Sequence, residues 1–318
     1  MFIESFKIVG GAVTQILILG AVGYILVKKD VLGECGLDNI SRFTLDITLP
    51  LLIFTQLVKD FSFSLYPDWW IFPLISIAVT ALGLGLGLLL SIFIKGTGQK
   101  LQFASLVGFQ NSGYLPLALL AALLPAGDLK VIFVYLFLFL LGFNLVTFSV
   151  GVYLLTFLKG KKFSWLSLLS TPVAAVLVSL FFVFFKLVRF IPDFIFNPLK
   201  LIGDCTLPLA MLVVGGSLAK IKLEHVDAKA MALMVLAKLI MLPLLGFFLL
   251  LKLKLPYLIG LLIFIELAMP PAANLSVIIR SYKKEDFLIS QGIFFGHILS
   301  IVLLPVLLSL YFMFVMLK

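Results

Sequence analysis

The sequence predicts an all-α integral membrane protein with ten transmembrane helices, arranged as two halves of five helices with opposite orientations. The 318-residue chain is 63% hydrophobic and only 12% charged, with a mean hydropathy of +1.24, whereas soluble proteins carry about 25% charged residues. Ten apolar stretches approach the roughly 20 residues that a hydrocarbon core requires. A hexapeptide that begins at Asp46 returns, changed at one position, 158 residues later. These three observations together predict a duplicated membrane protein.

The ten predicted spans differ in whether a charge interrupts them. Six contain no charged residue: 8–27, 69–94, 101–127, 131–158, 163–185 and 287–317. Four more contain a charged residue within the span: 40–58 (Asp46), 201–219 (Asp204), 229–251 (Lys238) and 255–279 (Glu266). The segments between the spans are short. We therefore expect one membrane domain and no separate extramembrane domain.

The repeated hexapeptide indicates how the halves are related. Residues 46–51 read DITLPL and residues 204–209 read DCTLPL. Because each half has an odd number of spans, the second must enter the membrane from the opposite side. The sequence thus predicts a first repeat over 1–158, a cytoplasmic linker over 159–165 and an inverted second repeat over 166–318.

The basic residues predict the orientation. With the N-terminus outside, the inner loops carry 14 Lys and Arg and the outer segments carry 9, as the positive-inside rule requires. Both termini are then extracytoplasmic in a cell membrane, either a plasma membrane or a bacterial inner membrane. The net charge of +9 lies in turns and not on one face, so we expect the lipid bilayer as a partner and no nucleic acid.

Several classes of protein find no support in the sequence. The first apolar run follows Glu4 and ends in two lysines without a small-residue cleavage site, unlike a signal peptide. The chain has no metalloprotease or serine hydrolase motif, and its two histidines, His225 and His297, are too few for a histidine metal site. Two cysteines suggest neither a disulfide framework nor a metal cluster. We expect no enzyme, no metal and no cofactor.

Two spans contain helix breakers at corresponding depths. Residues 110–116 of the fourth span read QNSGYLP, and residues 268–274 of the ninth read AMPPAAN. Proline removes a backbone donor and clashes with the preceding turn. In lipid, each freed backbone group costs several kcal/mol unless it is buried in protein or lines a wet cavity. The two breaks therefore predict a cavity in the middle of the membrane.

Polar side chains at these breaks are candidates for binding. A half-helix begins with a partial positive charge that attracts carboxylates and ends with carbonyls that attract cations. We expect Asn111, Ser112, Asn274 and Ser276 to hydrogen-bond a small organic anion. Alternatively, these side chains only satisfy the freed backbone.

Charged residues inside the spans are candidates for coupling to an ion. A charge at the bilayer centre costs about 2.5–3.5 kcal/mol on insertion scales. Lys238 could pair with a carboxylate, and Glu266 could bind a proton or a cation; a structural Lys–Glu pair is the alternative. Asp46 and Asp204 either cap a helix or relay an ion. For His297 a core role is favoured.

The same residues carry a resemblance to a known family. A Thr-Leu-Pro-Leu in spans 2 and 7, the break in span 4, Lys238 to Pro243 in span 8 and the Pro-Pro-Ala-Ala-Asn break in span 9 resemble the auxin efflux carrier family. That family includes the plant PIN carriers and bacterial malonate and malate permeases, and it shares its fold with bile-acid sodium symporters. The resemblance covers essentially the whole chain.

The resemblance implies a fold and a mechanism. It implies a scaffold from spans 1, 2, 6 and 7, a transport part from spans 3–5 and 8–10, broken helices that cross at the substrate site, an elevator movement and a homodimer. By this resemblance Asn111, Pro116, Pro271 and Asn274 take the crossover role, and Lys238 matches a membrane lysine of many relatives. Together with the residues singled out above, the predicted substrate residues are Asn111, Ser112, Gly113, Tyr114, Pro116, Pro270, Pro271, Asn274 and Ser276, and the predicted coupling residues are Lys238, Glu266, Asp46 and Asp204.

There are also departures from these relatives. The long cytosolic loop of the plant carriers is missing, since only the turn at 159–165 stands there. Glu266 lies where the symporters have a sodium-binding glutamate, but it lacks the Gln-Asn that follows there. We therefore expect a secondary transporter of small organic anions, either auxin-like acids or mono- and dicarboxylates, that is coupled to protons or works as a uniporter. A sodium symporter, a passive channel and a receptor stay open as alternatives.

Overall fold

The computed structural model describes residues 2–156, 168–281 and 287–315. The predicted linker at 159–165 lies outside the described residues. All regular structure in the described ranges is helical, apart from one isolated bridge between residues 110 and 271. The predicted all-α class is therefore confirmed.

The helices of the first half run up to residue 156. They are α1 (Phe2–Lys28), α2 (Glu34–Phe43), the π-helical η1 (Thr44–Thr48), α3 (Leu49–Asp60), α4 (Ile71–Leu90), η2 (Ser91–Phe93), α5 (Thr97–Gly108), α6 (Tyr114–Leu123), α7 (Ala126–Val146), the π-helical η3 (Thr147–Gly151) and α8 (Val152–Thr156).

The helices of the second half begin at residue 171. They are α9 (Thr171–Phe184), η6 (Leu187–Phe190), α10 (Asp193–Asp204), α11 (Thr206–Ala219), α12 (Ala228–Val235), the π-helical η7 (Leu236–Met241), α13 (Leu242–Lys252), α14 (Tyr257–Ala268), α15 (Asn274–Ser281) and α16 (Phe287–Val315).

Seven helices of the described chain are long and apolar enough to cross a membrane: Phe2–Lys28, Cys35–Asp60, Ile71–Phe93, Ala126–Leu155, Asp193–Ala219, Ala228–Lys252 and Phe287–Phe314. Three shorter apolar helices are α6, α9 and α14. These three fall in the predicted spans 4, 6 and 9. Two of those spans are interrupted in the middle, and the first part of the sixth lies outside the described residues. A multi-pass membrane protein is thus supported, while the number of ten crossings stays a prediction.

Two of the π-helical turns, η1 and η7, stand just before a proline, whereas η3 is followed by α8, which contains none. Pro50 lies at the start of α3 directly after η1, and Pro243 lies at the start of α13 directly after η7. The missing N–H and the bulk of a proline disturb the preceding turn of a helix, and a π-bulge is one way to absorb this disturbance. Lys238 is therefore carried by an irregular turn.

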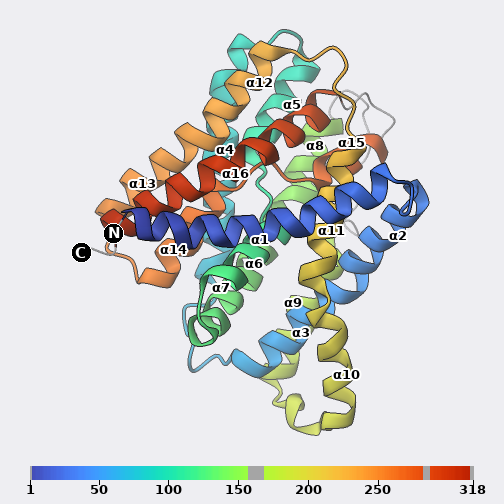
Figure 1. Ribbon diagram of the computed structural model, residues 1–318. Coiled ribbons are helices and arrows are strands. Elements are labelled where there is room, and N and C mark those ends of the chain that lie inside the picture. Colours follow the sequence, from blue (N-terminus) through green and yellow to red (C-terminus); the bar gives the residue numbers. More distant parts are fainter. Residues whose placement is uncertain (1, 157–167, 282–286, 316–318) are drawn as a thin grey trace.

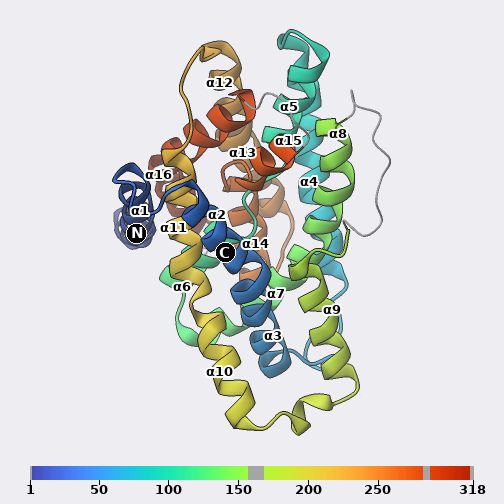
Figure 2. The same cartoon turned by 90° about the vertical axis from the view of Figure 1, so that its right-hand side faces the viewer.

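The helices differ in how far they are covered by the rest of the protein. The helical stretch Ala126–Leu155 contains α7, and 72% of the residues in its most apolar part are buried. In the most apolar part of α1, only 22% of the residues are buried. Figure 1 shows α1 running across the outside of the molecule, over α6 and α11, with α16 beside it. Figure 2 shows α3, α9 and α10 gathered at one end and α5 and α12 at the other. α7 is thus central and α1 peripheral.

Glycines permit the closest helix contacts. A Cβ atom on Gly215 of α11 would lie 1.8 Å from the Gly20 carbonyl oxygen of α1, and one on Gly23 would lie 2.1 Å from the Leu212 carbonyl oxygen. Small residues let helix backbones approach closely in membranes, where packing and not the hydrophobic effect drives association. The backbones of α1 and α11 are therefore in direct van der Waals contact.

Replacing Gly215 by alanine is expected to destabilise the protein by about 1–3 kcal/mol, the usual cost of overpacking. The added methyl group would meet main-chain atoms, which cannot rotate away as a side chain does. The measurement is the thermal unfolding midpoint in detergent. Gly11→Ala on α1 is the matched control, because a Cβ there meets nothing within 4 Å. Equal midpoints for the two variants would contradict the packing.

The row of alternating glycines in α4 has a similar role at two of its three positions. A Cβ on Gly83 would lie 3.0 Å from the Cα of Gly108 in α5, and one on Gly87 would lie 2.8 Å from the Cα of Ala104. Gly85 faces open space. Close packing of α4 on α5 thus fixes the half-helix that leads into the first break.

Candidate functional site

Both spans that were predicted to be broken are interrupted in the structure. α5 ends at Gly108 and α6 begins at Tyr114, while α14 ends at Ala268 and α15 begins at Asn274. The breaks start 160 residues apart, two more than the offset of the hexapeptides. At about 1.5 Å per residue, α6 with its 10 residues is about 15 Å long, half of a hydrocarbon core of about 30 Å. The breaks therefore separate half-membrane helices.

The two breaks have different local causes. Pro270 and Pro271 stand inside the second break and remove two consecutive backbone donors. Pro116 instead lies in the first turn of α6, where its missing N–H has no helical partner anyway. Gly113 has φ −88°, and a Cβ there would meet nothing within 4 Å. The first break thus does not depend on the conformational freedom of glycine.

The two breaks lie against each other and pair through their backbones. The Asn111 N–H donates to the Pro270 carbonyl and the Ala272 N–H donates to the Phe109 carbonyl, both at 2.9 Å. The paired segments run antiparallel. Each break thereby supplies partners for backbone groups that the other leaves free, and the ends of four half-helices converge at one place.

Unpartnered polar atoms gather at or near the breaks. The side chains of Gln110, Ser112, Lys238 and Glu266 are each at most 1% exposed. Among the described residues, the following buried atoms have no hydrogen-bond partner: both polar atoms of the Gln110 amide, Ser112 Oγ, Asn274 Oδ1, Lys238 Nζ and both carboxylate oxygens of Glu266. Buried polar groups are normally bonded. Such a group of atoms marks a place where a ligand, an ion or water completes the bonding.

Glu266 is at the centre of this group. Gln110 and Ser112 of the first break lie beside its carboxylate, and Lys238 of η7 is near enough to attract it. The carboxylate and the Lys238 ammonium nevertheless form no contact ion pair. The predicted Lys–Glu pair is therefore brought together across α14 and η7, with both charges still open to a further partner.

The remaining break residues are partly occupied by local bonds. The Ser276 hydroxyl donates to the Ala273 carbonyl at 3.0 Å, which is the structural role that the sequence left open for it. Tyr114 is the half-buried first residue of α6. Asn274 begins α15. Asn111 and Asn274 are thus the asparagines at the breaks, one from each broken span, and Gln110 adds a further amide at the first break.

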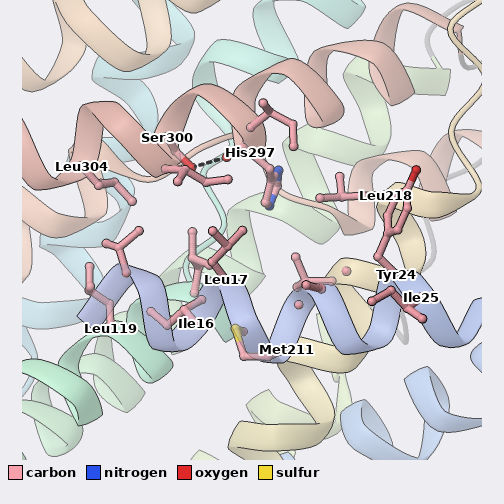
Figure 3. Close-up of a pocket in the computed structure, with 18 residues that line it drawn as sticks. Ile16, Leu17, Tyr24, Ile25, Leu119, Met211, Leu218, His297, Ser300 and Leu304 are labelled. Atoms are coloured by element: carbon pink, nitrogen blue, oxygen red, sulfur yellow. Dashed lines mark hydrogen bonds between the residues drawn. The ribbon is translucent and has the colours of Figure 1, made fainter. Parts of the chain in front are cut away.

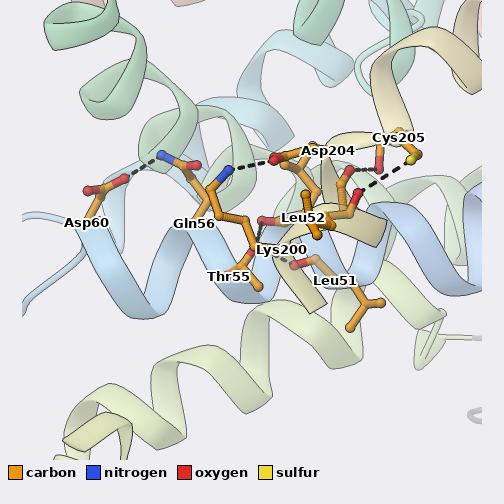
Figure 4. Close-up of polar contacts among 11 residues, drawn as sticks. Leu51, Leu52, Thr55, Gln56, Asp60, Lys200, Asp204 and Cys205 are labelled. Atoms are coloured by element: carbon orange, nitrogen blue, oxygen red, sulfur yellow. Dashed lines mark hydrogen bonds and ion pairs between the residues drawn. The ribbon is translucent and has the colours of Figure 1, made fainter. Parts of the chain in front are cut away.

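Asp46 and Asp204 make their hydrogen bonds at helix ends, although Asp46 is near enough to Tyr114 at the start of α6 to repel a negative charge there. Asp46 is exposed in η1 and accepts a hydrogen bond of 3.0 Å from the Thr171 hydroxyl at the start of α9. Asp204 ends α10 and pairs with Lys200 at 2.5 Å, both half-exposed (Figure 4). In the same region the Gln56 amide donates to a carboxylate of α3. Helix-end contacts are therefore what the structure gives these two aspartates.

His297 is a residue that the sequence did not place at the site. It lies in α16, is 5% exposed, and has Nε2 at 3.2 Å from Asn111 Nδ2. Nothing in the apolar run around it distinguishes a core histidine from this contact. A Cβ on Gly296, the preceding residue, would lie 2.5 Å from Pro271 Cδ. α16 therefore runs close along both breaks, and only the tertiary structure reveals it.

An apolar cavity of about 260 Å³ adjoins His297. Its walls come from α1, α6, α11 and α16, and Figure 3 shows α16 facing α1 across it. His297 and Ser300 are among its few polar residues. Leu17, Ile25 and Ile298, which also line it, are 41–49% exposed. The cavity thus connects the surroundings of the first break with the outer surface.

Comparison with known proteins identifies the family. A sequence model of the family described as membrane transport protein matches residues 8–157 and 155–308. The chain is also similar to the uncharacterized transporter C5D6.04 of Schizosaccharomyces pombe (strain 972 / ATCC 24843), with 26% identity over 110 residues. This similarity covers 34% of the chain and 24% of the yeast protein. Because the family model matches nearly the whole chain, the resemblance to auxin efflux carriers is confirmed and the protein belongs to the membrane transport protein family.

Proposed function

We propose that this transporter is a secondary carrier of small organic anions, which bind where its two broken spans meet. The observation that carries the proposal is the pairing of the breaks through the Asn111 and Ala272 backbone N–H groups. It brings the first turns of α6 and α15 to the same place as the unpartnered side chains. Substrate sites at interrupted helices are typical of secondary transporters.

The chemistry of this place suits a carboxylate. The first turn of each half-helix leaves backbone N–H groups without helical partners, and each helix start carries roughly half a positive charge. Lys238 adds an ammonium group with no hydrogen-bond partner, and the side chains of Asn111 and Asn274 each carry an amide NH₂. A mono- or dicarboxylate, including aromatic acids of the auxin type, supplies acceptors for such donors.

The pattern of helix packing supports an inverted repeat of five and five helices. α1 packs on α11 and α16, and α9 packs on α3 and α7. An offset of about 160 residues places α1 on α9, α3 on α11 and α7 on α16. The packing partners of one half therefore correspond to those of the other. Crossing of the broken spans follows from the same symmetry.

An elevator movement is the mechanism that this arrangement suits. α1, α3, α9 and α11 form the proposed scaffold, and the broken spans belong to the proposed transport part. The apolar cavity is lined by helices of both parts, α1 and α11 of the scaffold and α6 and α16 of the transport part, and apolar walls there carry no hydrogen bonds that sliding would break. The charge distribution of the loops supports a topology in which both termini are extracytoplasmic in the cell membrane. The family resemblance supports a homodimer.

Lys238 and Glu266 are the proposed coupling pair. Protonation of the buried Glu266 carboxylate would remove its negative charge and its attraction to Lys238. Deprotonation would restore both during the transport cycle. A sodium symporter is the second candidate, because Glu266, Ser112 and Gln110 place side-chain oxygens without hydrogen bonds side by side. Oxygen ligands are those that hard cations prefer.

Uptake into proteoliposomes tests the proposed function. With malate, malonate and indole-3-acetate as labelled substrates, we expect saturable uptake of at least one, accelerated by the same anion inside the vesicles. A proton gradient or a sodium gradient should drive it, depending on the coupling ion. Flux without such acceleration would favour a channel, and tight binding without flux would favour a receptor.

Asn274→Ala is expected to lower uptake about 10- to 100-fold, since a hydrogen bond to a charged group contributes about 1.5–3 kcal/mol. Its Oδ1 is buried without a partner, so no hydrogen bond to that oxygen holds the amide, which can turn its NH₂ donors toward an anion. Ser276→Ala is the matched control on the same helix, because the Ser276 hydroxyl already donates to a local carbonyl. Uptake that is unchanged in Asn274→Ala would remove Asn274 from the binding site.

A further inference from the structure

The contact between His297 and Asn111 couples a titratable ring to a candidate substrate residue. Nδ1 of His297 lies 2.8 Å from the Ile293 carbonyl oxygen, and Nε2 lies 3.2 Å from Asn111 Nδ2. Asn111 is held at the paired breaks by its own backbone N–H. Whether His297 Nε2 accepts or donates a hydrogen bond therefore determines which way the Asn111 side-chain amide is turned.

The partners of the ring fix its neutral form. A carbonyl oxygen can only accept, so Nδ1 carries the hydrogen and donates to Ile293. In a neutral imidazole with a protonated Nδ1, Nε2 has a lone pair and accepts. The Asn111 amide nitrogen donates to it, which turns Asn111 Oδ1 away from the ring.

Protonation of the ring reverses this arrangement. When Nε2 takes up a proton, both ring nitrogens become donors, and an N–H then faces the amide N–H of Asn111. The clash is removed when the amide turns over, which the broad terminal torsion of asparagine allows. Asn111 Oδ1 then accepts from Nε2, and the amide NH₂ faces away from the ring.

We propose that His297 is a positioning residue through which one proton and one anion bind together. With a neutral ring, Asn111 turns a carbonyl oxygen toward a ligand at the breaks, which repels a carboxylate. With a protonated ring, Asn111 turns two N–H donors toward it. The proposal rests on the proposed function, because it takes the ligand to be an organic anion.

Among the described titratable groups around α16, His297 is the one in contact with Asn111. The elements packed on α16 are α1, α5, α12, η7, α13, α14 and α15. Tyr24 of α1 lines the same cavity, and the buried Lys238 and Glu266 interact with each other. The other described ionisable side chains of these elements lie within two turns of helix ends: Glu4, Lys7, Lys28, Lys100, Lys229, Lys252 and Tyr257.

The cavity gives the ring contact with open space. Figure 3 shows the His297 ring directed from α16 into the cavity opposite α1. Exposed residues at its rim belong to membrane-spanning helices and would face lipid. A proton therefore reaches the ring through water that enters the cavity and not through this opening.

Histidine NMR tests the coupling without any substrate. The chain has only two histidines, and His225 lies in a loop with φ 50°, which asparagine tolerates. In full-length His225→Asn protein labelled at histidine and asparagine, we expect the Nδ1–H form of His297 at alkaline pH. As His297 becomes doubly protonated, the Asn111 side-chain amide, assigned from its loss in Asn111→Ala, should shift in the same step. The opposite tautomer, an unresponsive amide or a ring that stays neutral until the protein unfolds would overturn the proposal.

Calorimetric binding of malate and indole-3-acetate, both largely ionised above about pH 6, tests the link to the anion. Above the His297 transition, affinity should fall by about tenfold per pH unit, as linkage to one proton requires. His297→Gln, which keeps an amide partner but cannot be charged, should remove this slope. Ser300→Ala, which lines the same cavity and bonds only to the His297 carbonyl, should keep it.

The possible outcomes separate the two proposals. Binding of either anion with the same slope in wild type and His297→Gln would overturn the role of His297 and leave the proposed function standing. If neither anion binds, the proposed function fails for these substrates, while the NMR titration still decides whether the ring and the amide are coupled.

Discussion

Replacing Lys238 by methionine is expected to abolish transport and to destabilise the folded protein, whereas replacing Lys238 and Glu266 together should recover folding but not transport. Both side chains are 0% exposed, and each is the other's nearest opposite charge. Removing one partner of a buried pair leaves an uncompensated charge, which costs about 3–5 kcal/mol. Replacing both by neutral residues of similar size removes that cost.

The measurement compares folded yield and thermal midpoint with flux at several pH values. The double variant is Lys238→Met with Glu266→Gln. Lys229→Met is the control, because Lys229 is exposed in α12 of the same predicted span. If the pair were only structural, the double variant would transport like the wild type with the same pH dependence. Loss of flux in a well-folded double variant would assign the pair to coupling or to substrate binding.

The positions of the breaks could be predicted from the sequence because prolines and polar residues are rare in apolar spans. Pro270 and Pro271 mark the second break directly, and the repeat then points to the first. The exact register could not be predicted, since the breaks are offset by 160 residues and the hexapeptides by 158. The first break contains no proline, and its conformation is set by pairing with the second. That pairing is a tertiary contact without a local signal.

The polar residues show the same limit. A buried charge in a membrane span is costly wherever it lies, so Lys238 and Glu266 could be singled out from the sequence alone. Asp46 and Asp204 share a repeated motif, yet Asp46 lies near the break residue Tyr114 whereas Asp204 pairs with Lys200 at a helix end. His297 reaches Asn111 only because Gly296 lets α16 approach Pro271 closely. Sequence patterns thus identify which residues are unusual, and the packing decides which of them meet.

Replacing Ala272 by proline is expected to lower transport about 10- to 100-fold, because it removes one of the two backbone hydrogen bonds that join the breaks. The Ala272 N–H donates to the Phe109 carbonyl at 2.9 Å, and Phe109 is 0% exposed. Leaving a buried acceptor without its partner costs about 1–3 kcal/mol, which shifts an equilibrium between paired and separated breaks by the stated factor.

Ala273→Pro is the matched control for this change. The described chain shows no partner for the Ala273 N–H, and proline is tolerated where a helix such as α15 begins. Transport assays on both variants, normalised to folded protein, then separate the lost hydrogen bond from the added ring. If both variants lost transport equally, rigidity of the second break and not its pairing would matter. If only Ala272→Pro loses transport, the substrate site depends on the hydrogen bonds between the two breaks. Each break then holds the helix start of the other in the position at which it binds the anion.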